Sequence, residues 1–200
     1  MWKKAKYLYR GEKMKKVLIT GATSGIGLAI SKKMLDMGYS VYGVGRDFSK
    51  IDIASSNFYP IICDLIKYQN IEDMIKKLKK EVDIDTLINC AGVGYFGPHE
   101  EINPTKLHKM IALNLEAPLI LTQLLLRDLK KRKGTVINIS SITATKASTY
   151  GCAYSATKAG LVHFSKGLFD EVRKTGVKVI SILPDITKTP FYDELNFREG

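Results

Sequence analysis

A tyrosine and a lysine stand four residues apart in the segment "CAYSATKAG", at Tyr154 and Lys158. Side chains at positions i and i+4 share one face of a helix, so the ammonium group lies beside the phenol if this segment is helical. A phenol has an ordinary pKa of about 10, and a cation within about 4–6 Å lowers that pKa. The pair could therefore exchange a proton near neutral pH, although an isolated pair of this kind more often covers the edge of a core.

A serine precedes this pair at the end of the apolar segment "INISS", at Ser141. A hydroxyl group at the end of a strand could donate a hydrogen bond to a substrate oxygen that gains negative charge during a reaction. The alternative is a serine that only bonds the backbone at the strand end. The chemistry therefore depends on elements that bring Ser141, Tyr154 and Lys158 together.

Short β-branched apolar runs alternate with helical periods along the chain. The apolar runs lie at 16–20, 40–45, 59–64, 86–91, 135–140 and 177–183, and the helical periods lie at 25–37, 69–82, 104–132 and 152–175. This alternation is typical of βαβ units whose parallel sheet is covered by helices on both faces. We therefore predict a doubly wound α/β sheet of the Rossmann type. The link between the second and third runs has too little periodicity for a full helix and is expected to form a turn.

A glycine-rich segment, "TGATSGIG", follows the first apolar run. Gly21, Gly25 and Gly27 have the spacing GxxxGxG, which differs from the commoner dinucleotide pattern GxGxxG. Glycines permit a tight turn and let backbone N–H groups approach an anion at the N-terminus of a helix. The segment predicts a phosphate site, and the alternative is a tight turn that only packs the helix closely.

The second apolar run ends in "GVGRD", where the cofactor preference of a dinucleotide site is set. A carboxylate at this place accepts the ribose hydroxyls of NAD, whereas an arginine accommodates the 2′-phosphate of NADP. Gly45 stands where the acid would be, and Arg46 follows it. The pattern predicts NADP over NAD, with Asp47 as a complication and an ordinary exposed arginine as the alternative.

Polar residues also follow the third and fourth apolar runs, with Asp64 in "CDL" and Asn89 in "NCAG". Ligands of open α/β sheets bind beyond the carboxyl ends of the strands, so both residues are candidates for cofactor contacts. Asp64 would lie near the adenine. The alternative is that Asp64 caps the helix that follows it.

Taken in order, these segments resemble the short-chain dehydrogenase/reductase family, in its single-domain branch, from Lys15 almost to the end of the chain. The matching pieces are "TGATSGIG", Asp64, "NCAG", "MIALNLEAP", "INISS", "YSATK" and "LPDITKTP". The resemblance implies an oxidoreductase that transfers a hydride between a nicotinamide cofactor and a ketone or aldehyde and its alcohol. It implies that Tyr154 is the acid or base, Lys158 lowers its pKa, Ser141 bonds the substrate oxygen, and Asn114 supports a water that leads to Lys158.

The resemblance also implies the cofactor contacts. They are Gly21, Thr23, Ser24, Gly25, Ile26, Gly27, Arg46, Asp64, Leu65, Asn89, Ala91, Gly92, Tyr154, Lys158, Pro184 and Thr189. Two features depart from the family pattern. Asp185 stands where a glycine is usual, and the sequence ends at Gly200 without the last helix and strand that members usually have.

Charge and hydropathy disfavour two other kinds of partner. The net charge is +11, but the first 16 residues hold +6 of it, and the remaining lysines are spread along helical periods as solvated faces. Binding of nucleic acid is therefore not expected.

No apolar run approaches 18 residues, so no membrane span is expected, and the basic N-terminus has no apolar core of a secretory signal. We predict a cytoplasmic protein that forms a homo-oligomer in its full-length form.

The cysteines and histidines do not predict a metal site, because Cys63, Cys90 and Cys152 show no CxxC spacing and the histidines no HxxxH spacing. The three cysteines are expected to be reduced, buried thiols.

The chain is expected to form one dinucleotide-binding domain over residues 14–200, preceded by a basic extension at 1–13. The loop 92–103 contains Tyr95 and Phe96, which predict an apolar wall for the substrate or packing against neighbouring loops. Two alternatives to a general carbonyl reductase stay open. One is a 3-oxoacyl carrier-protein reductase, which would suit a basic surface, and the other is a regulatory protein that binds NADP without turning it over.

Overall fold

The computed structural model describes residues 14–146, 148–187, 189 and 191. Within them, six parallel strands form one sheet in the order β3-β2-β1-β4-β5-β6. The strands are β1 (Lys16–Thr20), β2 (Ser40–Gly45), β3 (Phe58–Ile62), β4 (Thr86–Asn89), β5 (Thr135–Ile139) and β6 (Lys178–Ile182). The chain adds β2 and β3 on one side of β1 and then β4, β5 and β6 on the other side. The change of side lies between β1 and β4, which is the point where doubly wound sheets bind ligands. The predicted fold class is confirmed.

The helices lie close to the predicted periods. They are α1 (Gly25–Asp36), α2 (Tyr68–Glu81), α3 (Pro104–Ile111), α4 (Ala117–Arg132) and α5 (Cys152–Val172), with a π-helical turn η2 (Ala112–Glu116) that joins α3 to α4. Short 3-10 turns η1 (His99–Glu101), η3 (Ile142–Ala144) and η4 (Arg173–Thr175) complete the described elements. The link between β2 and β3 contains turns and no helix in its described residues, as the weak periodicity predicted.

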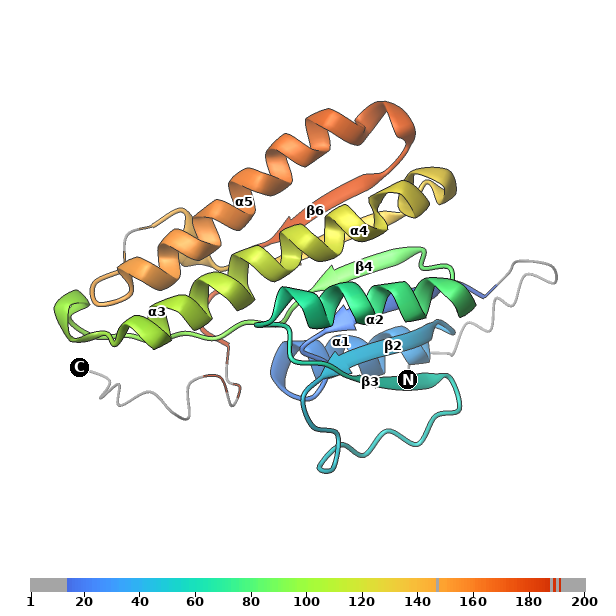
Figure 1. Ribbon diagram of the computed structural model, residues 1–200, viewed down its shortest axis with the longest axis horizontal. Coiled ribbons are helices and arrows are strands. Elements are labelled where there is room, and N and C mark those ends of the chain that lie inside the picture. Colours follow the sequence, from blue (N-terminus) through green and yellow to red (C-terminus); the bar gives the residue numbers. More distant parts are fainter. Residues whose placement is uncertain (1–13, 147, 188, 190, 192–200) are drawn as a thin grey trace, which may run out of the picture.

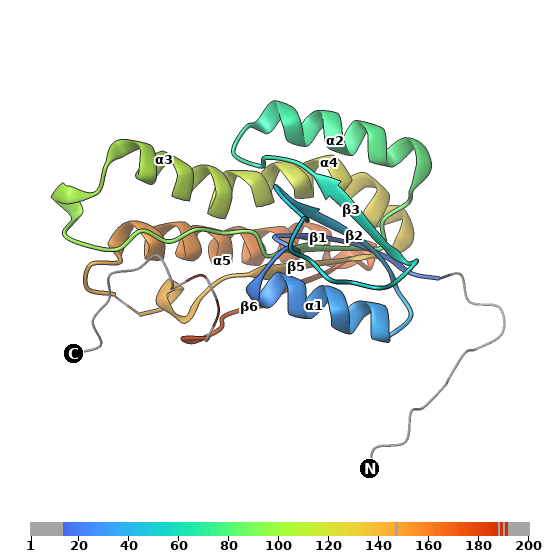
Figure 2. The ribbon, with the colours of Figure 1, turned by 90° about the horizontal axis from the view of Figure 1, so that it is seen from below.

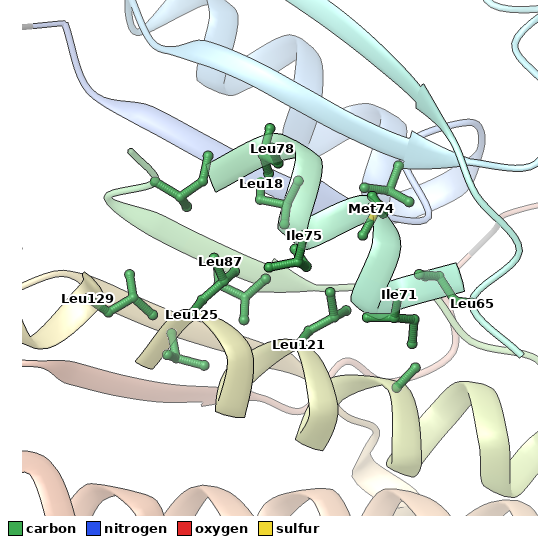
Figure 3. Packing of buried hydrophobic residues seen from close by; sticks show 14 of the residues in the cluster. Leu18, Leu65, Ile71, Met74, Ile75, Leu78, Leu87, Leu121, Leu125 and Leu129 are labelled. Carbon is green, nitrogen blue, oxygen red and sulfur yellow. The ribbon is translucent and has the colours of Figure 1, made fainter. Parts of the chain in front are cut away.

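Helices cover both faces of the sheet, with α1 on one side and α2 and α4 on the other (Figure 2). Helices α4 and α5 lie side by side on the second face (Figure 1). The apolar residues of α2 recur at the helical spacing, as Ile71, Met74, Ile75 and Leu78. They pack against the sheet and against the leucines Leu121, Leu125 and Leu129 of α4 (Figure 3).

The segment Pro104–Arg132, which spans α3, η2 and α4, is long and apolar enough to cross a membrane by length and composition. The core helix of a doubly wound fold passes the same test. In this chain Leu121, Leu125 and Leu129 are almost fully buried between α2 and the sheet. This burial is typical of a core helix. The structure contains no membrane, so the absence of a membrane span stays a prediction.

The structure corrects several local expectations. The strands β3, β4 and β5 end at Ile62, Asn89 and Ile139, one or two residues before the predicted runs end. Of the three cysteines, Cys63 is buried and Cys90 is half-buried, but Cys152 is exposed. The expectation of three buried thiols is therefore wrong for Cys152, which lies in the first turn of α5.

Candidate active site

A cleft of about 560 Å³ lies where the chain leaves the carboxyl ends of β1, β2, β4, β5 and β6. It brings together most of the site residues predicted from the sequence. These are Gly21, Ser24, Gly25, Ile26, Gly27, Arg46, Ala91, Gly92, Ser141, Tyr154, Lys158, Pro184 and Thr189.

The glycine turn builds one end of this cleft. Gly21 has a φ of +69°, and a Cβ atom there would lie 2.9 Å from the Cα atom of Ala91. A Cβ atom on Gly27 would overlap the carbonyl oxygen of Gly21. Helix α1 begins here without a side-chain cap and without an acidic residue in its first turn. Its first N–H groups therefore face the cleft as donors for an anion, which fits the pyrophosphate of a dinucleotide.

A buried threonine, which the sequence did not single out, connects this turn to the next strand. The hydroxyl oxygen of Thr20 accepts hydrogen bonds from the backbone N–H groups of Cys90 and Ala91, both at 3.0 Å. Thr20 precedes the glycine turn, and its two bonds hold the segment that follows β4 beside that turn. Ala91 of this segment lines the cleft.

Thr20→Val is expected to lower the free energy of unfolding by about 1–3 kcal/mol, because a nearly isosteric side chain leaves two backbone donors without their acceptor. The measurement is urea denaturation followed by circular dichroism. Thr20→Ser keeps the hydroxyl group and is expected to lose clearly less stability. Equal losses in the two variants would show that packing of the methyl group, and not the hydrogen bonds, is what matters.

Arg46 lines the cleft and is exposed at the end of β2. The carboxylate of Asp47 accepts hydrogen bonds from the Ser49 backbone N–H at 2.8 Å and from the Ser49 hydroxyl at 3.0 Å. These bonds hold the pKa of Asp47 below its ordinary value. Among the described residues Arg46 forms no ion pair, so Asp47 does not neutralise it.

Gly45 is also restricted by its surroundings, because a Cβ atom there would overlap the methyl group of Thr23. A carboxylate side chain at this position would have to displace Thr23. Thr23 itself packs on β2 and is not among the residues that line the cleft.

The opposite end of the cleft contains Tyr154 and Lys158, both on α5 and both buried. The Nζ atom of Lys158 lies 5.8 Å from the ring centroid of Tyr154 and donates a hydrogen bond of 3.0 Å to the carbonyl oxygen of Ile139. Burial lowers the pKa of Lys158 from 10.5 to about 8, and the nearby Cys90 opposes this shift. The ammonium group is therefore held close to its titration point, beside the phenol ring.

Ser141 follows β5. Its side-chain oxygen accepts two hydrogen bonds from Thr143, one from the backbone N–H at 3.2 Å and one from the side-chain hydroxyl at 3.0 Å. A hydroxyl oxygen has two lone pairs, so these bonds leave its own proton as the remaining capacity. Ser141 can therefore donate that proton into the cleft. The adjacent Ser140 donates to the carbonyl oxygen of Lys158 at 2.9 Å and ties β5 to α5.

Asn114 lies in the π-helical turn η2, is fully buried and does not line the cleft. Its side chain pairs with both backbone groups of Val93 at 2.8 Å and donates to the hydroxyl of Thr157 at 3.1 Å. Single π-helical turns inside α-helices occur frequently at functional sites. Asn114 thus anchors the loop after β4 to α5, and its part in a water relay to Lys158 stays a prediction.

Three other selected residues lie outside the cleft. Asn89 is buried and donates to the side-chain oxygen of Asn138 at 2.8 Å, and Leu65 is buried in the core. Asp64 accepts from the backbone N–H of Ile66 at 3.1 Å. The alternative that Asp64 caps α2 is wrong, because α2 begins at Tyr68 with Lys67 at the cap position.

Two aromatic rings pack against Tyr154; of these, Phe191 lines the cleft and Phe96 does not. The ring centroids of Phe96 and Phe191 lie 5.3 Å and 5.9 Å from that of Tyr154. Tyr95 also lines the cleft, with Lys106 beside it. The sequence pattern indicated Tyr95 and Phe96 but not Phe191 or Lys106, because nothing near the latter two in the sequence indicates their contacts with Tyr154 and Tyr95.

Comparison with known proteins agrees with this geometry. Residues 15–200 match the short chain dehydrogenase family. The chain belongs to this family. An uncharacterized oxidoreductase of Staphylococcus epidermidis is 33% identical over 193 residues, which cover 94% of this chain and 84% of that protein. A 3-oxoacyl-(acyl-carrier-protein) reductase of Buchnera aphidicola is 33% identical over 184 residues, which cover 89% of this chain and 75% of that protein.

A solved structure adds the cofactor. The short chain dehydrogenase of Leptospira borgpetersenii with bound NAD+ has a TM-score of 0.81 and 28% identity, covering 86% of this chain and 71% of that one. The chain is therefore an NAD(P)-dependent dehydrogenase or reductase of the short chain dehydrogenase family.

Among the described residues, no group of three or more His, Cys, Asp or Glu side chains could hold a metal ion.

Proposed function

We propose that this short chain dehydrogenase interconverts a ketone or aldehyde with its alcohol, prefers NADP(H) to NAD(H), and uses Tyr154 as its acid or base. The observation that supports the proposal most is that one cleft joins the glycine turn and Arg46 to Ser141, Tyr154 and Lys158. The cleft thus offers a site for an anionic dinucleotide and a site for proton transfer within reach of the same bound molecules.

The cofactor site is formed by the first turn of α1, by Arg46 and by the segment after β6 that contains Pro184 and Thr189. A nicotinamide cofactor bound there would supply or accept the hydride. A guanidinium is always charged and matches the geometry of a phosphate. Arg46 would therefore bind the 2′-phosphate of NADP.

At the other end, Ser141 donates a hydrogen bond to the carbonyl oxygen of the substrate and orients it toward Tyr154. Tyr154 gives its proton to that oxygen in reduction and accepts a proton from the alcohol in oxidation. The buried ammonium of Lys158 stabilises the phenolate that remains. Because the pKa of Lys158 is about 8, its ammonium stabilises the phenolate at pH 7, and this stabilisation is lost as the pH rises through 8.

Arg46→Ala is expected to raise the dissociation constant of NADPH at least about 10-fold, because charge-assisted hydrogen bonds to a phosphate are among the strong ones. NADH lacks that phosphate, so its dissociation constant is expected to change by less than about twofold. The measurement is fluorescence titration of both cofactors. Lys50→Ala serves as the control, because it removes another exposed cation from the segment between β2 and β3. Equal losses for the two cofactors would show that Arg46 does not bind the 2′-phosphate.

A thermal melt with and without each cofactor tests the proposal first. Ligand at about a hundred times its dissociation constant adds about 2.7 kcal/mol to stability, which gives a visible shift. A larger shift with NADPH supports the cofactor preference, and a screen of ketones and aldehydes with NADPH then tests turnover. Binding of NADPH without any turnover would instead favour the regulatory alternative.

A second candidate substrate is a 3-oxoacyl group on an acidic carrier protein. The net charge of +11 and the carrier-protein reductase among the relatives favour it. Turnover that requires the carrier and falls steeply with salt would support it. The cytoplasmic location, the homo-oligomer and the single domain at 14–200 stay predictions.

A further inference from the structure

The substrate end of the cleft contains a cation that neither the cofactor site nor the proton-transfer site uses. Lys106 lies in the first turn of α3 and lines the cleft together with Tyr95, Tyr154 and Phe191. We propose that the carbonyl substrate carries a carboxylate, and that Lys106 binds this carboxylate beside the ring of Tyr95. The inference rests on the proposed carbonyl chemistry and adds the class of substrate.

The ring of Tyr95 contacts the ammonium group of Lys106 at the wall of the cleft. The Nζ atom of Lys106 lies 5.3 Å from the ring centroid of Tyr95, which is a cation–π distance. The backbone N–H of Tyr95 donates to the sulfur of Met110 at 3.4 Å, so the loop that holds this ring is docked on the helix that holds Lys106. The ammonium group is thus kept at the wall of the cleft, although its side chain is exposed.

Within the described segments, the acidic residues near the cleft do not pair with Lys106. Among the described residues that line the cleft, the only acidic one is Asp185, whose Oδ1 atom accepts from the backbone N–H of Ile186 at 2.7 Å. Glu100 and Glu101 lie in the nearby turn η1 but do not line the cleft. Within the part of the chain that the structure describes, Lys106 forms no ion pair.

Two other cations among the described residues that line the cleft have different surroundings. Arg46 lies at the end of β2, beside the glycine turn. Lys158 is buried, and its ammonium bonds the carbonyl oxygen of Ile139. Among the described cations that line the cleft, Lys106 is therefore the one available to a second group of the substrate.

The apolar residues near Lys106 indicate what kind of chain joins the ketone of the substrate to its carboxylate. Tyr95 and Phe96 pack with Tyr154, Ile102 and Met110 in one cluster. An aromatic wall next to an ammonium suits a short hydrocarbon spacer that ends in an anion, since apolar area is buried while the charges pair. The fitting class is an oxo acid with a few methylene groups between its ketone and its carboxylate.

Calorimetric titration with saturating NADP+ tests the inference without turnover. The probes are 4-oxopentanoate, 5-oxohexanoate and 6-oxoheptanoate, each paired with its methyl ester, which keeps the ketone and removes the charge. In the wild type, at least one acid is expected to bind about 10-fold or more tightly than its ester, as a charge-assisted hydrogen bond implies. Lys106→Met is expected to remove that preference, and Lys109→Met, an exposed lysine of the same helix outside the cleft, to retain it.

Three outcomes would overturn the inference: no preference for the acid in the wild type, a preference that survives in Lys106→Met, or no binding of any acid. Turnover of the methyl esters with NADPH is measured in parallel. Ester turnover without a preference for the acid would overturn the carboxylate site and leave the proposed function standing. Binding that depends on Lys106 but without turnover of any probe would support the site and count against the proposed function.

Discussion

Tyr154→Phe is expected to lower kcat for carbonyl reduction by about 10³-fold and to leave the dissociation constant of NADPH within about twofold. The size of the loss follows from the proton donor, whose contribution to general acid catalysis is about 10²–10⁴-fold. The substitution removes one oxygen and keeps the ring, which packs against Phe96 and Phe191. The fold and the cofactor site are therefore expected to survive. The measurements are kcat at saturating substrate and fluorescence titration of NADPH.

Tyr150→Phe is the matched control, because Tyr150 is 55% exposed, stands four residues earlier and does not line the cleft. Its kcat is expected to stay within about twofold of the wild type, since exposed substitutions away from a site have little effect. Activity retained in Tyr154→Phe would mean that another group supplies the proton. Weakened NADPH binding in that variant would mean that the phenol is a cofactor contact first.

Lys158→Met is expected to stabilise the folded chain at pH 7 while it abolishes turnover. Burial lowers the pKa of Lys158 from 10.5 to about 8, so the folded state holds the ammonium at a cost. One pKa unit corresponds to about 1.4 kcal/mol, and the lost bond to Ile139 offsets part of the gain, so a net gain of about 1–3 kcal/mol is expected. Methionine fills a similar volume without a charge.

The pH dependence identifies the cause of this gain. Between pH 8 and 10.5 the unfolded chain binds more protons at Lys158 than the folded chain does, so wild-type stability rises with pH relative to the variant. The advantage of Lys158→Met is therefore expected to be largest below pH 8 and to shrink as the pH approaches 10.5. Urea denaturation at pH 7 and pH 10 measures it, with the exposed Lys166→Met as the control. A variant less stable than the wild type at pH 7 would contradict the cost of burial.

Much of the fold could be predicted because it depends on patterns that repeat along the chain. The alternation of apolar runs and helical periods indicated βαβ units, and such units allow few parallel topologies. The segment 104–132 shows the limit of this reasoning, because its periodicity indicated one helix. The structure places the π-helical turn Ala112–Glu116 inside it, where Asn114 bonds Val93 and Thr157. No local pattern indicated that turn, since its contacts are with distant segments.

The sequence by itself determined the pairs that lie within one element. Tyr154 and Lys158 share a face of α5 because of the helical repeat, and the glycine turn follows directly from residues 20–27. Only the tertiary structure decided that Thr20 bonds Cys90 and Ala91, and that Lys106 lies beside Tyr95. A helical repeat is a property of neighbouring residues, whereas these contacts depend on how separate strands, loops and helices pack.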